Sequence, residues 1–149
     1  MTHKDLALQY FSEHLHCSQA VLAAFASECG ITEEQALRLG SCFGSGMRKG
    51  EVCGACTGAL MVLGLLYGQI KAGDLDGRQR SDELNDEMMQ RFAEKCGSYI
   101  CNDLLGCDVG TLQGRQYARD NHLFTEFCPK MVANAVDILE EIVAKNGDL

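Results

Sequence analysis

The sequence has little of what marks disordered, fibrous, β-sheet or membrane-spanning proteins. Its 149 residues include one proline and no tryptophan, and 46% are hydrophobic, which excludes disordered and collagen-like chains. The longest apolar run, residues 58–68, contains three glycines and is shorter than the roughly 18 residues that a membrane-spanning helix needs. Alternating strand patterns and internal repeats are also absent. We therefore expect one helical domain, residues 1–149, with no membrane partner.

Basic residues are scarce as well. The chain has 13 lysines and arginines against 21 aspartates and glutamates, a net charge of −8. A chain this acidic repels phosphate backbones and anionic lipids. Arg48, Lys49 and the pair Arg78 and Arg80 are too few to form a basic stripe, so we expect no nucleic-acid partner. Residues 1–6 lack the basic region and apolar segment of a secretory signal, so we expect a cytoplasmic protein.

Helical patterns run through most of the chain. They predict an all-α fold, a compact bundle of five to seven helices around a glycine-rich central helix. The expected helices, taken from apolar spacing and propensity, cover residues 4–14, 20–26, 32–42, 53–68, 81–96, 99–106 and a last helix from Cys128.

Capping residues mark some of these helix ends. Thr32 and Gln35 form a capping-box pattern, and Pro129 occupies the first-turn position that proline favours. Residues 70–80, rich in glycine and aspartate, predict a surface loop, and residues 107–121 predict a polar, irregular segment.

Nine cysteines are far more than an ordinary chain of this length contains. Their odd number, without a leader peptide, argues against the disulfide framework of a secreted domain. In a reducing cytoplasm, a set this large is more typical of metal binding or redox activity. The alternative for any single cysteine is that it acts as a small buried hydrophobic residue. We expect that packing role for Cys29, Cys42 and Cys96.

Four cysteines share a position within their predicted helices. Residues three or four apart share one face of a helix. By this spacing, each of the four cysteines lies on the apolar, core-facing side of a different predicted helix, near the N-terminal end of that helix. The four are Cys17, Cys53, Cys101 and Cys128. Helix N-termini have free N–H donors and partial positive charge that stabilise thiolate, the form that binds metal and attacks disulfides. If these helix ends meet, the four sulfurs suit an iron–sulfur cluster, with tetrahedral zinc as the alternative.

The segments around these cysteines resemble a known family. Cys53-Gly54-Ala55-Cys56-Thr57-Gly58 matches a Cys-Gly-Ala-x-x-Gly motif, and the further matching segments are Cys17-Ser18-Gln19-Ala20-Val21, Phe43-Gly44-Ser45-Gly46-Met47, Gly58-Ala59-Leu60, Gly64-Leu65, Cys101-Asn102-Asp103-Leu104-Leu105-Gly106 and Cys128. On these residues the chain resembles the C_GCAxxG_C_C family of small bacterial and archaeal redox-active proteins. The resemblance implies that the family's four signature cysteines fall on Cys17, Cys53, Cys101 and Cys128, with a redox role and a bound iron–sulfur or other metal cofactor.

Cys53 and Cys56 also form a Cys-x-x-Cys at the start of a predicted helix. That spacing permits a reversible disulfide or two metal ligands. Cys96 and Cys107 are further thiols that could supply spare ligands or a resolving thiol. The basic residues 48–49 would stabilise a thiolate or an anionic cluster nearby.

The sequence leaves three functions open. The first is electron transfer or redox sensing by an iron–sulfur cluster on the four signature cysteines, with the acidic surface selecting a basic redox partner protein. The second is a thiol–disulfide oxidoreductase in which Cys53 attacks and Cys56, Cys101 or Cys128 resolves. The third is non-enzymatic, a metal carrier or a helical module stabilised by zinc. A homodimer through an exposed apolar helix face is compatible with all three.

Overall fold

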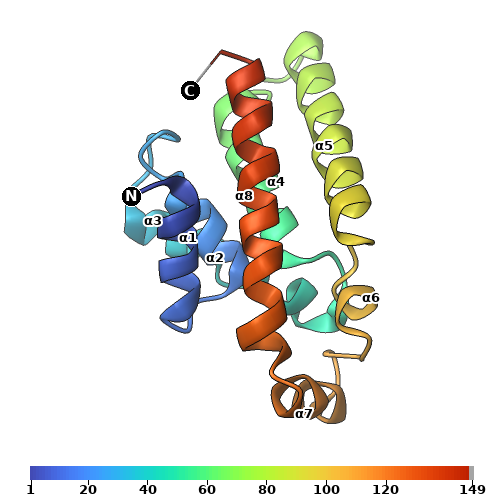
Figure 1. Cartoon of the computed structure of the whole chain (residues 1–149). Helices are drawn as coiled ribbons and strands as arrows, with labels where there is room; N and C mark the ends of the chain where they lie inside the picture. The colour runs from blue at the N-terminus through green and yellow to red at the C-terminus, as the bar shows by residue number, and fades with distance from the viewer. Residues whose placement is uncertain (148–149) are drawn as a thin grey trace.

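The computed structural model describes residues 1–147 and, over that range, confirms the predicted all-α class (Figure 1). Its segments are α1 His3–Ser12, α2 Cys17–Ala24, α3 Glu33–Gly40, the turn η1 Gly46–Gly50, α4 Gly54–Tyr67, α5 Leu75–Cys96, α6 Cys101–Leu105, α7 Leu112–Asp120, the π-helical turn η2 Leu123–Phe127 and α8 Cys128–Lys145. Within residues 1–147 these segments outnumber the predicted five to seven helices. None of the helices described there is both long and apolar enough to cross a membrane.

The centre of the core is the packing of α2 against the glycine-rich helix α4. Residues 18–24 of α2 are all buried. The two backbones approach so closely that a Cβ atom at Gly58 would lie 2.8 Å from the carbonyl oxygen of Ser18. Only glycine leaves that space free, so the glycines of α4 let the two helices meet almost backbone to backbone. The predicted central helix is therefore confirmed.

The long helix α8 covers this pair and links it to α1 and α5 (Figure 1). It starts at Cys128 with proline in its first turn, as predicted. Its buried residues recur at helical spacing along the side facing the core: Met131, Val132, Ala135, Val136, Ile138, Leu139, Ile142 and Val143.

Two helices were not expected at their observed places. α5 begins at Leu75, inside the predicted loop 70–80, because the Asp74 carboxylate accepts a hydrogen bond from the Gly77 N–H at 3.0 Å. α7 lies inside the predicted irregular segment 107–121, and the Thr111 hydroxyl accepts the Gly114 N–H at 2.9 Å. In both cases an N-cap side chain compensates for a glycine in the first helical turn.

His3 holds α1 against the rest of the bundle. Its ring stacks on Phe25 with 4.0 Å between ring centroids. Its Nε2 lies 2.7 Å from a Glu28 oxygen and its Nδ1 lies 2.9 Å from a Glu140 oxygen. Two carboxylate neighbours require both ring nitrogens to donate, so the geometry suits the imidazolium form. Burial lowers the pKa of His3, but the hydrogen bonds and charges of Glu28 and Glu140 outweigh it, and the net pKa is raised above 6.5.

We expect the His3 contacts to make stability depend on pH. Because the folded-state pKa is raised, their stabilisation is complete below pH 6.5 and is lost as the pH rises through the folded-state pKa. His3→Gln should lower the melting temperature by a few degrees, roughly 3–5 °C, at pH 5.5, and by clearly less at pH 8.5. Thermal denaturation followed by circular dichroism measures both values. A constant difference between the two proteins across this pH range would contradict the imidazolium assignment.

Candidate functional site

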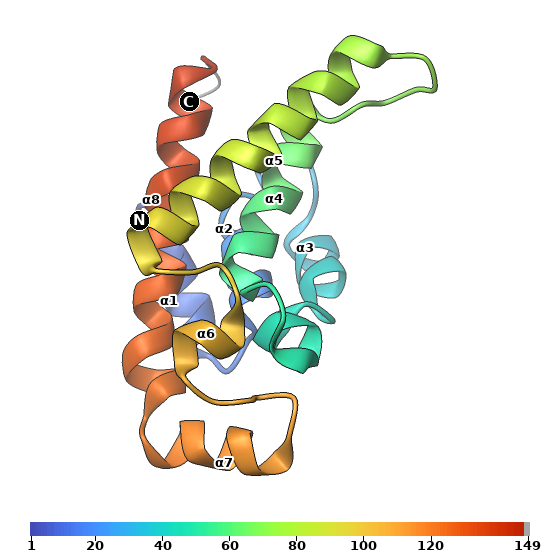
Figure 2. The same cartoon turned by 90° about the vertical axis from the view of Figure 1, so that its right-hand side faces the viewer.

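The four predicted cysteines begin four different helices, and the structure brings them together. Cys17, Cys101 and Cys128 are the first residues of α2, α6 and α8, and Cys53 is the residue that caps α4. The thiol of Cys53 is hydrogen-bonded to Cys17, and the charge of Cys17 acts on both Cys101 and Cys128. The helix N-termini therefore meet around one group of sulfurs. Figure 2 shows α4 and α6 starting side by side.

A short antiparallel contact of the backbone joins the segments that carry Cys53 and Cys101. Val52 and Ile100 form an isolated β-bridge. On either side of it, the Cys53 N–H donates to the Tyr99 carbonyl at 2.7 Å and the Cys101 N–H donates to the Glu51 carbonyl at 2.6 Å. These bonds fix the two segments before their helices begin, so the relative position of the two thiols does not depend on side-chain packing alone.

Gly54 sets Cys17 beside Cys53. A Cβ atom at position 54 would lie 2.5 Å from the Cys17 sulfur and 3.0 Å from the Phe43 carbonyl oxygen. The sulfur of Cys17 therefore occupies the space that any side chain at residue 54 would need. In the Cys-Gly-Ala segment, the glycine has a steric role next to a functional cysteine.

A left-handed turn supplies N–H donors to the same sulfur. Ser45, Met47 and Arg48 have φ values of 55°, 57° and 65°, and Gly46, between them, has a φ of 60°. Left-handed backbone costs a non-glycine residue roughly 1–2 kcal/mol. The turn directs the Ser45 N–H to the sulfur of Cys17, which also receives the Ser18 N–H. The glycine-rich segment before Cys53 thus has a defined conformation that contributes to the site.

The four thiols differ in how readily they ionise. The hydrogen bond from Cys53 and the backbone N–H groups lower the pKa of Cys17 to about 7, although burial opposes ionisation. The bond to Cys17, burial and the Cys17 charge raise the pKa of Cys53. Burial, with the charge of Cys17, raises the pKa of Cys101 to about 12 and also raises the pKa of Cys128. Without a cofactor, Cys17 and not Cys53 is thus the thiolate of the group.

Cys107 is a fifth thiol at this site. It follows α6 in the loop that leads to α7, and it packs with Cys128 against the buried Cys101. Asn102 holds the loop in place, because its side chain donates to an Asp108 oxygen at 3.0 Å and accepts the Val109 N–H at 2.9 Å. The sequence marks Cys107 as a spare thiol, and only the fold places it beside the signature cysteines.

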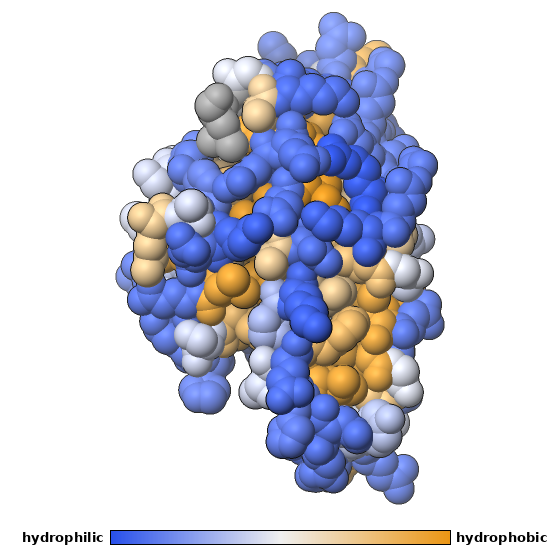
Figure 3. All heavy atoms as spheres, in the orientation of Figure 1, coloured by the Kyte–Doolittle hydropathy of each residue, from blue (hydrophilic) through white to orange (hydrophobic). Residues whose placement is uncertain are grey.

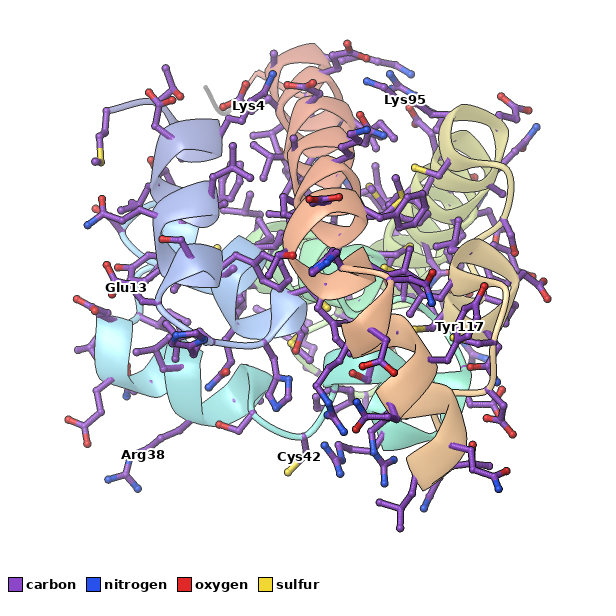
Figure 4. The ribbon with its side chains drawn as sticks, turned by 60° about the horizontal axis from the view of Figure 1, so that its bottom comes forward. Lys4, Glu13, Arg38, Cys42, Lys95 and Tyr117 are labelled. Atoms are coloured by element: carbon purple, nitrogen blue, oxygen red, sulfur yellow. The ribbon has the colours of Figure 1, made fainter. Side chains whose placement is uncertain are left out.

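The remaining cysteines lie away from this group. Cys56 is buried one helical turn beyond Cys53, and the thiol that influences it is that of Cys96. Cys29 and Cys96 pack against the core. The predicted packing role is wrong for Cys42, which is exposed after the end of α3 and whose sulfur points away from the protein (Figure 4).

The donors at the site are sulfurs. Within residues 1–147, no three His, Cys, Asp or Glu side chains are arranged to hold a single metal ion. A single zinc ion with Zn–S bonds of about 2.3 Å needs its four sulfurs within roughly 4 Å of one another. A cluster of several irons separates its thiolate ligands further, and cysteine is its usual ligand. The all-sulfur donor set, with N–H groups directed at the Cys17 sulfur, is compatible with an iron–sulfur cluster.

Hydrophobic side chains surround the site at the surface. Partly buried residues pack around Cys101 from the loop after α6, from η2 and from the start of α8: Cys107, Leu123, Phe124, Phe127 and Cys128. Figure 3 shows a hydrophobic surface between the N-terminal half of α8 and α6. The site is thus close to an apolar surface on an otherwise acidic protein.

We expect Gly54→Ala to disrupt the Cys17–Cys53 contact. The added methyl group displaces the Cys17 sulfur from its N–H donors and its thiol partner, so the pKa of Cys17 should rise from about 7 by roughly one unit or more. The ultraviolet absorbance of thiolate, titrated against pH in reduced, metal-free protein, measures this. Gly64→Ala is the matched control, because no atom lies within 4 Å of a Cβ at that position of the same helix. An unchanged titration in Gly54→Ala would contradict the steric role.

The chain matches a known protein family. No curated protein and no solved structure matches the chain. A family model described as "Putative redox-active protein (C_GCAxxG_C_C)" matches residues 15–142, a span that includes all four signature cysteines. The family name writes Gly before Cys in its motif, whereas residues 53–54 here are Cys-Gly. Because the match covers most of the 149 residues, the chain belongs to the C_GCAxxG_C_C family of redox-active proteins.

Proposed function

We propose that this protein transfers or senses electrons through an iron–sulfur cluster held by Cys17, Cys53, Cys101 and Cys128. The observation that carries the proposal is the convergence of four thiols from the N-terminal ends of four helices. Sulfur ligands, with backbone N–H groups directed at those of Cys17 and Cys53, form the kind of environment in which such clusters are stable. A bound cluster would supply one-electron redox chemistry at this position.

The residues of this chain would tune such a centre. The N–H groups of Ser45 and Ser18 already bind the Cys17 sulfur, and hydrogen bonds to ligand sulfur raise a cluster's reduction potential. Burial lowers the pKa of His16, the residue before Cys17, and the charge of Arg48 lowers it further, so Arg48 lies near the site. Its positive charge would favour the reduced, more negative state of the centre.

The surface indicates how a redox partner would approach. The net charge of −8 attracts a basic protein and repels nucleic acid. The apolar surface around Cys107 and Phe124 lies next to the site and could form the close contact that electron transfer requires. We propose a basic partner protein that docks there.

Cofactor content tests the proposal directly. Anaerobically purified or reconstituted protein should contain stoichiometric iron and sulfide, with a broad visible absorption that reductant bleaches. Cys101→Ser and Cys128→Ser should each lose most of the iron, because three thiolates hold a cluster poorly. Cys29→Ser and Cys42→Ser are the matched controls and should retain it, since neither thiol lies at the site.

Unchanged iron in the Cys101 and Cys128 variants would overturn the assignment of the ligands. Stoichiometric zinc without sulfide in the unsubstituted protein would favour the alternative of a metal carrier or a zinc-stabilised helical module. In that case removal of zinc by a chelator should lower the helical content and the melting temperature.

A second function is favoured by a separate observation. The Cys17–Cys53 hydrogen bond and the pKa of about 7 at Cys17 form a nucleophile and a neighbouring thiol suited to thiol–disulfide exchange. In this alternative Cys17 attacks a substrate disulfide and Cys53 resolves the mixed disulfide. The sequence predicts Cys53 as the attacking thiol. Because the pKa of Cys53 is raised, Cys53 is instead the resolving thiol in this alternative.

Oxidation of metal-free protein by a small disulfide separates the two functions. The unsubstituted protein should form a Cys17–Cys53 disulfide, and Cys53→Ser should accumulate a mixed disulfide on Cys17, since the thiol that is hydrogen-bonded to Cys17 has been removed. Mass spectrometry of tryptic peptides detects both products. Cys29 lies on the same tryptic peptide as Cys17, so Cys29→Ser is the necessary control. A Cys17 that remains unmodified would exclude this function.

A further inference from the structure

Two further cysteines lie together outside the four-cysteine site. Cys56 is completely buried on α4, with 0% of its surface exposed, and Cys96 is the half-buried last residue of α5. Both belong to the main hydrophobic core, where α4 packs against α5. Neither is one of the proposed cluster ligands.

The backbone explains why these two residues approach. The Val52–Ile100 bridge is antiparallel, so the chain after Val52 and the chain before Ile100 leave it in the same direction. Cys56 is four residues after Val52, and Cys96 is four residues before Ile100. The contact that joins the segments of Cys53 and Cys101 therefore also brings together the chain on its other side, where Cys56 and Cys96 lie in the packing of α4 against α5.

The surroundings of Cys96 differ from those of Cys56. Asn134 of α8 donates from Nδ2 to the Cys96 sulfur at 3.5 Å. Burial raises the pKa of Cys56 to about 12, and the charge of Cys96 adds to this rise. Cys96 is therefore the thiol that a reagent can reach, and Cys56 is the thiol behind it.

We propose that Cys56 and Cys96 form a second redox site, a dithiol that closes to a disulfide between α4 and α5 when a small disulfide oxidises the protein. The Cys96 thiolate attacks one sulfur of the oxidant, forms a mixed disulfide and releases one oxidant thiolate. The Cys56 thiolate then attacks the Cys96 sulfur, forms the Cys56–Cys96 bond and releases the second thiolate. The protein loses two electrons and two protons, and the oxidant is reduced to two thiols.

This bond joins the two segments that carry ligands of the proposed cluster. Cys56 is three residues from Cys53, and Cys96 is five residues from Cys101. The disulfide would close the loop formed by residues 57–95 and hold the end of α5 against the first turn of α4. Because a long closed loop restricts the unfolded chain, the oxidised form should be the more stable one.

Peptide mapping tests the pairing on the full-length, metal-free chain. Trypsin leaves Cys53 and Cys56 together on residues 50–71, and chymotryptic cleavage after Tyr99 separates Cys96 from Cys101. We would therefore oxidise Cys53→Ser with oxidised glutathione, alkylate the remaining thiols and digest with both proteases. The expected product is a peptide containing Cys56 linked to one containing only Cys96. Its absence, with Cys56 alkylated and Cys96 either alkylated or glutathionylated, overturns the proposal.

Melting temperature provides a second measurement that needs no change at Cys53. In a Cys17→Ser background, where the Cys17–Cys53 disulfide cannot form, oxidation should raise the melting temperature by about 5 °C. Adding Cys96→Ser should abolish this rise, whereas adding Cys107→Ser, the matched control, should preserve it. Equal rises in both double variants would overturn the proposal. Neither experiment depends on whether the protein binds a cluster. Both therefore test the Cys56–Cys96 disulfide even if no iron is found.

Discussion

The site depends on how closely α2 and α4 approach each other. Burying a thiolate is costly unless donors replace the lost water, and at Cys17 these donors are backbone N–H groups and the thiol of Cys53. They can reach the sulfur only because Gly54 leaves room for it. A side chain at residue 54 would separate the two helices at the point where their cysteines meet. One absent Cβ atom thus controls the position and the ionisation of the most acidic thiol in the group.

The left-handed turn before α4 serves the same contact. Ser45, Met47 and Arg48 adopt a backbone conformation that non-glycine residues rarely occupy, at a cost of roughly 1 kcal/mol or more for each. Such strain persists when the surrounding structure holds it. Here the Ser45 N–H binds the Cys17 sulfur, and the Asn102 side chain covers Gly50, where a side chain would collide with it. Strained backbone next to reactive thiols is the pattern expected of a functional site.

The antiparallel crossing of the chain at Val52 and Ile100 brings together the segments that carry two pairs of thiols. Next to the Val52–Ile100 bridge, Cys53 lies opposite Tyr99 and Cys101 lies opposite Glu51, so both thiols lie near the bridge. Further along the same two segments, Cys56 and Cys96 enter the packing of α4 against α5. The first pair belongs to a group at helix N-termini, where N–H donors can stabilise charge. The second lies between helices, where burial favours neutral thiols or a disulfide. The same crossing can therefore support two kinds of sulfur chemistry a few residues apart.

The sequence by itself determined the all-α class, the capping box at Thr32 and the start of α8 at Cys128, because helical phase and capping are local properties. The same local phase placed the four signature cysteines at helix starts. Local patterns misjudged α5 and α7, where Asp74 and Thr111 cap helices with glycine in the first turn. Only the tertiary structure decided that Cys17 has a lowered pKa, that Cys56 and Cys96 share the core between α4 and α5 and that Cys42 is exposed. Ionisation and pairing depend on neighbours brought from distant segments, and no local pattern specifies those distances.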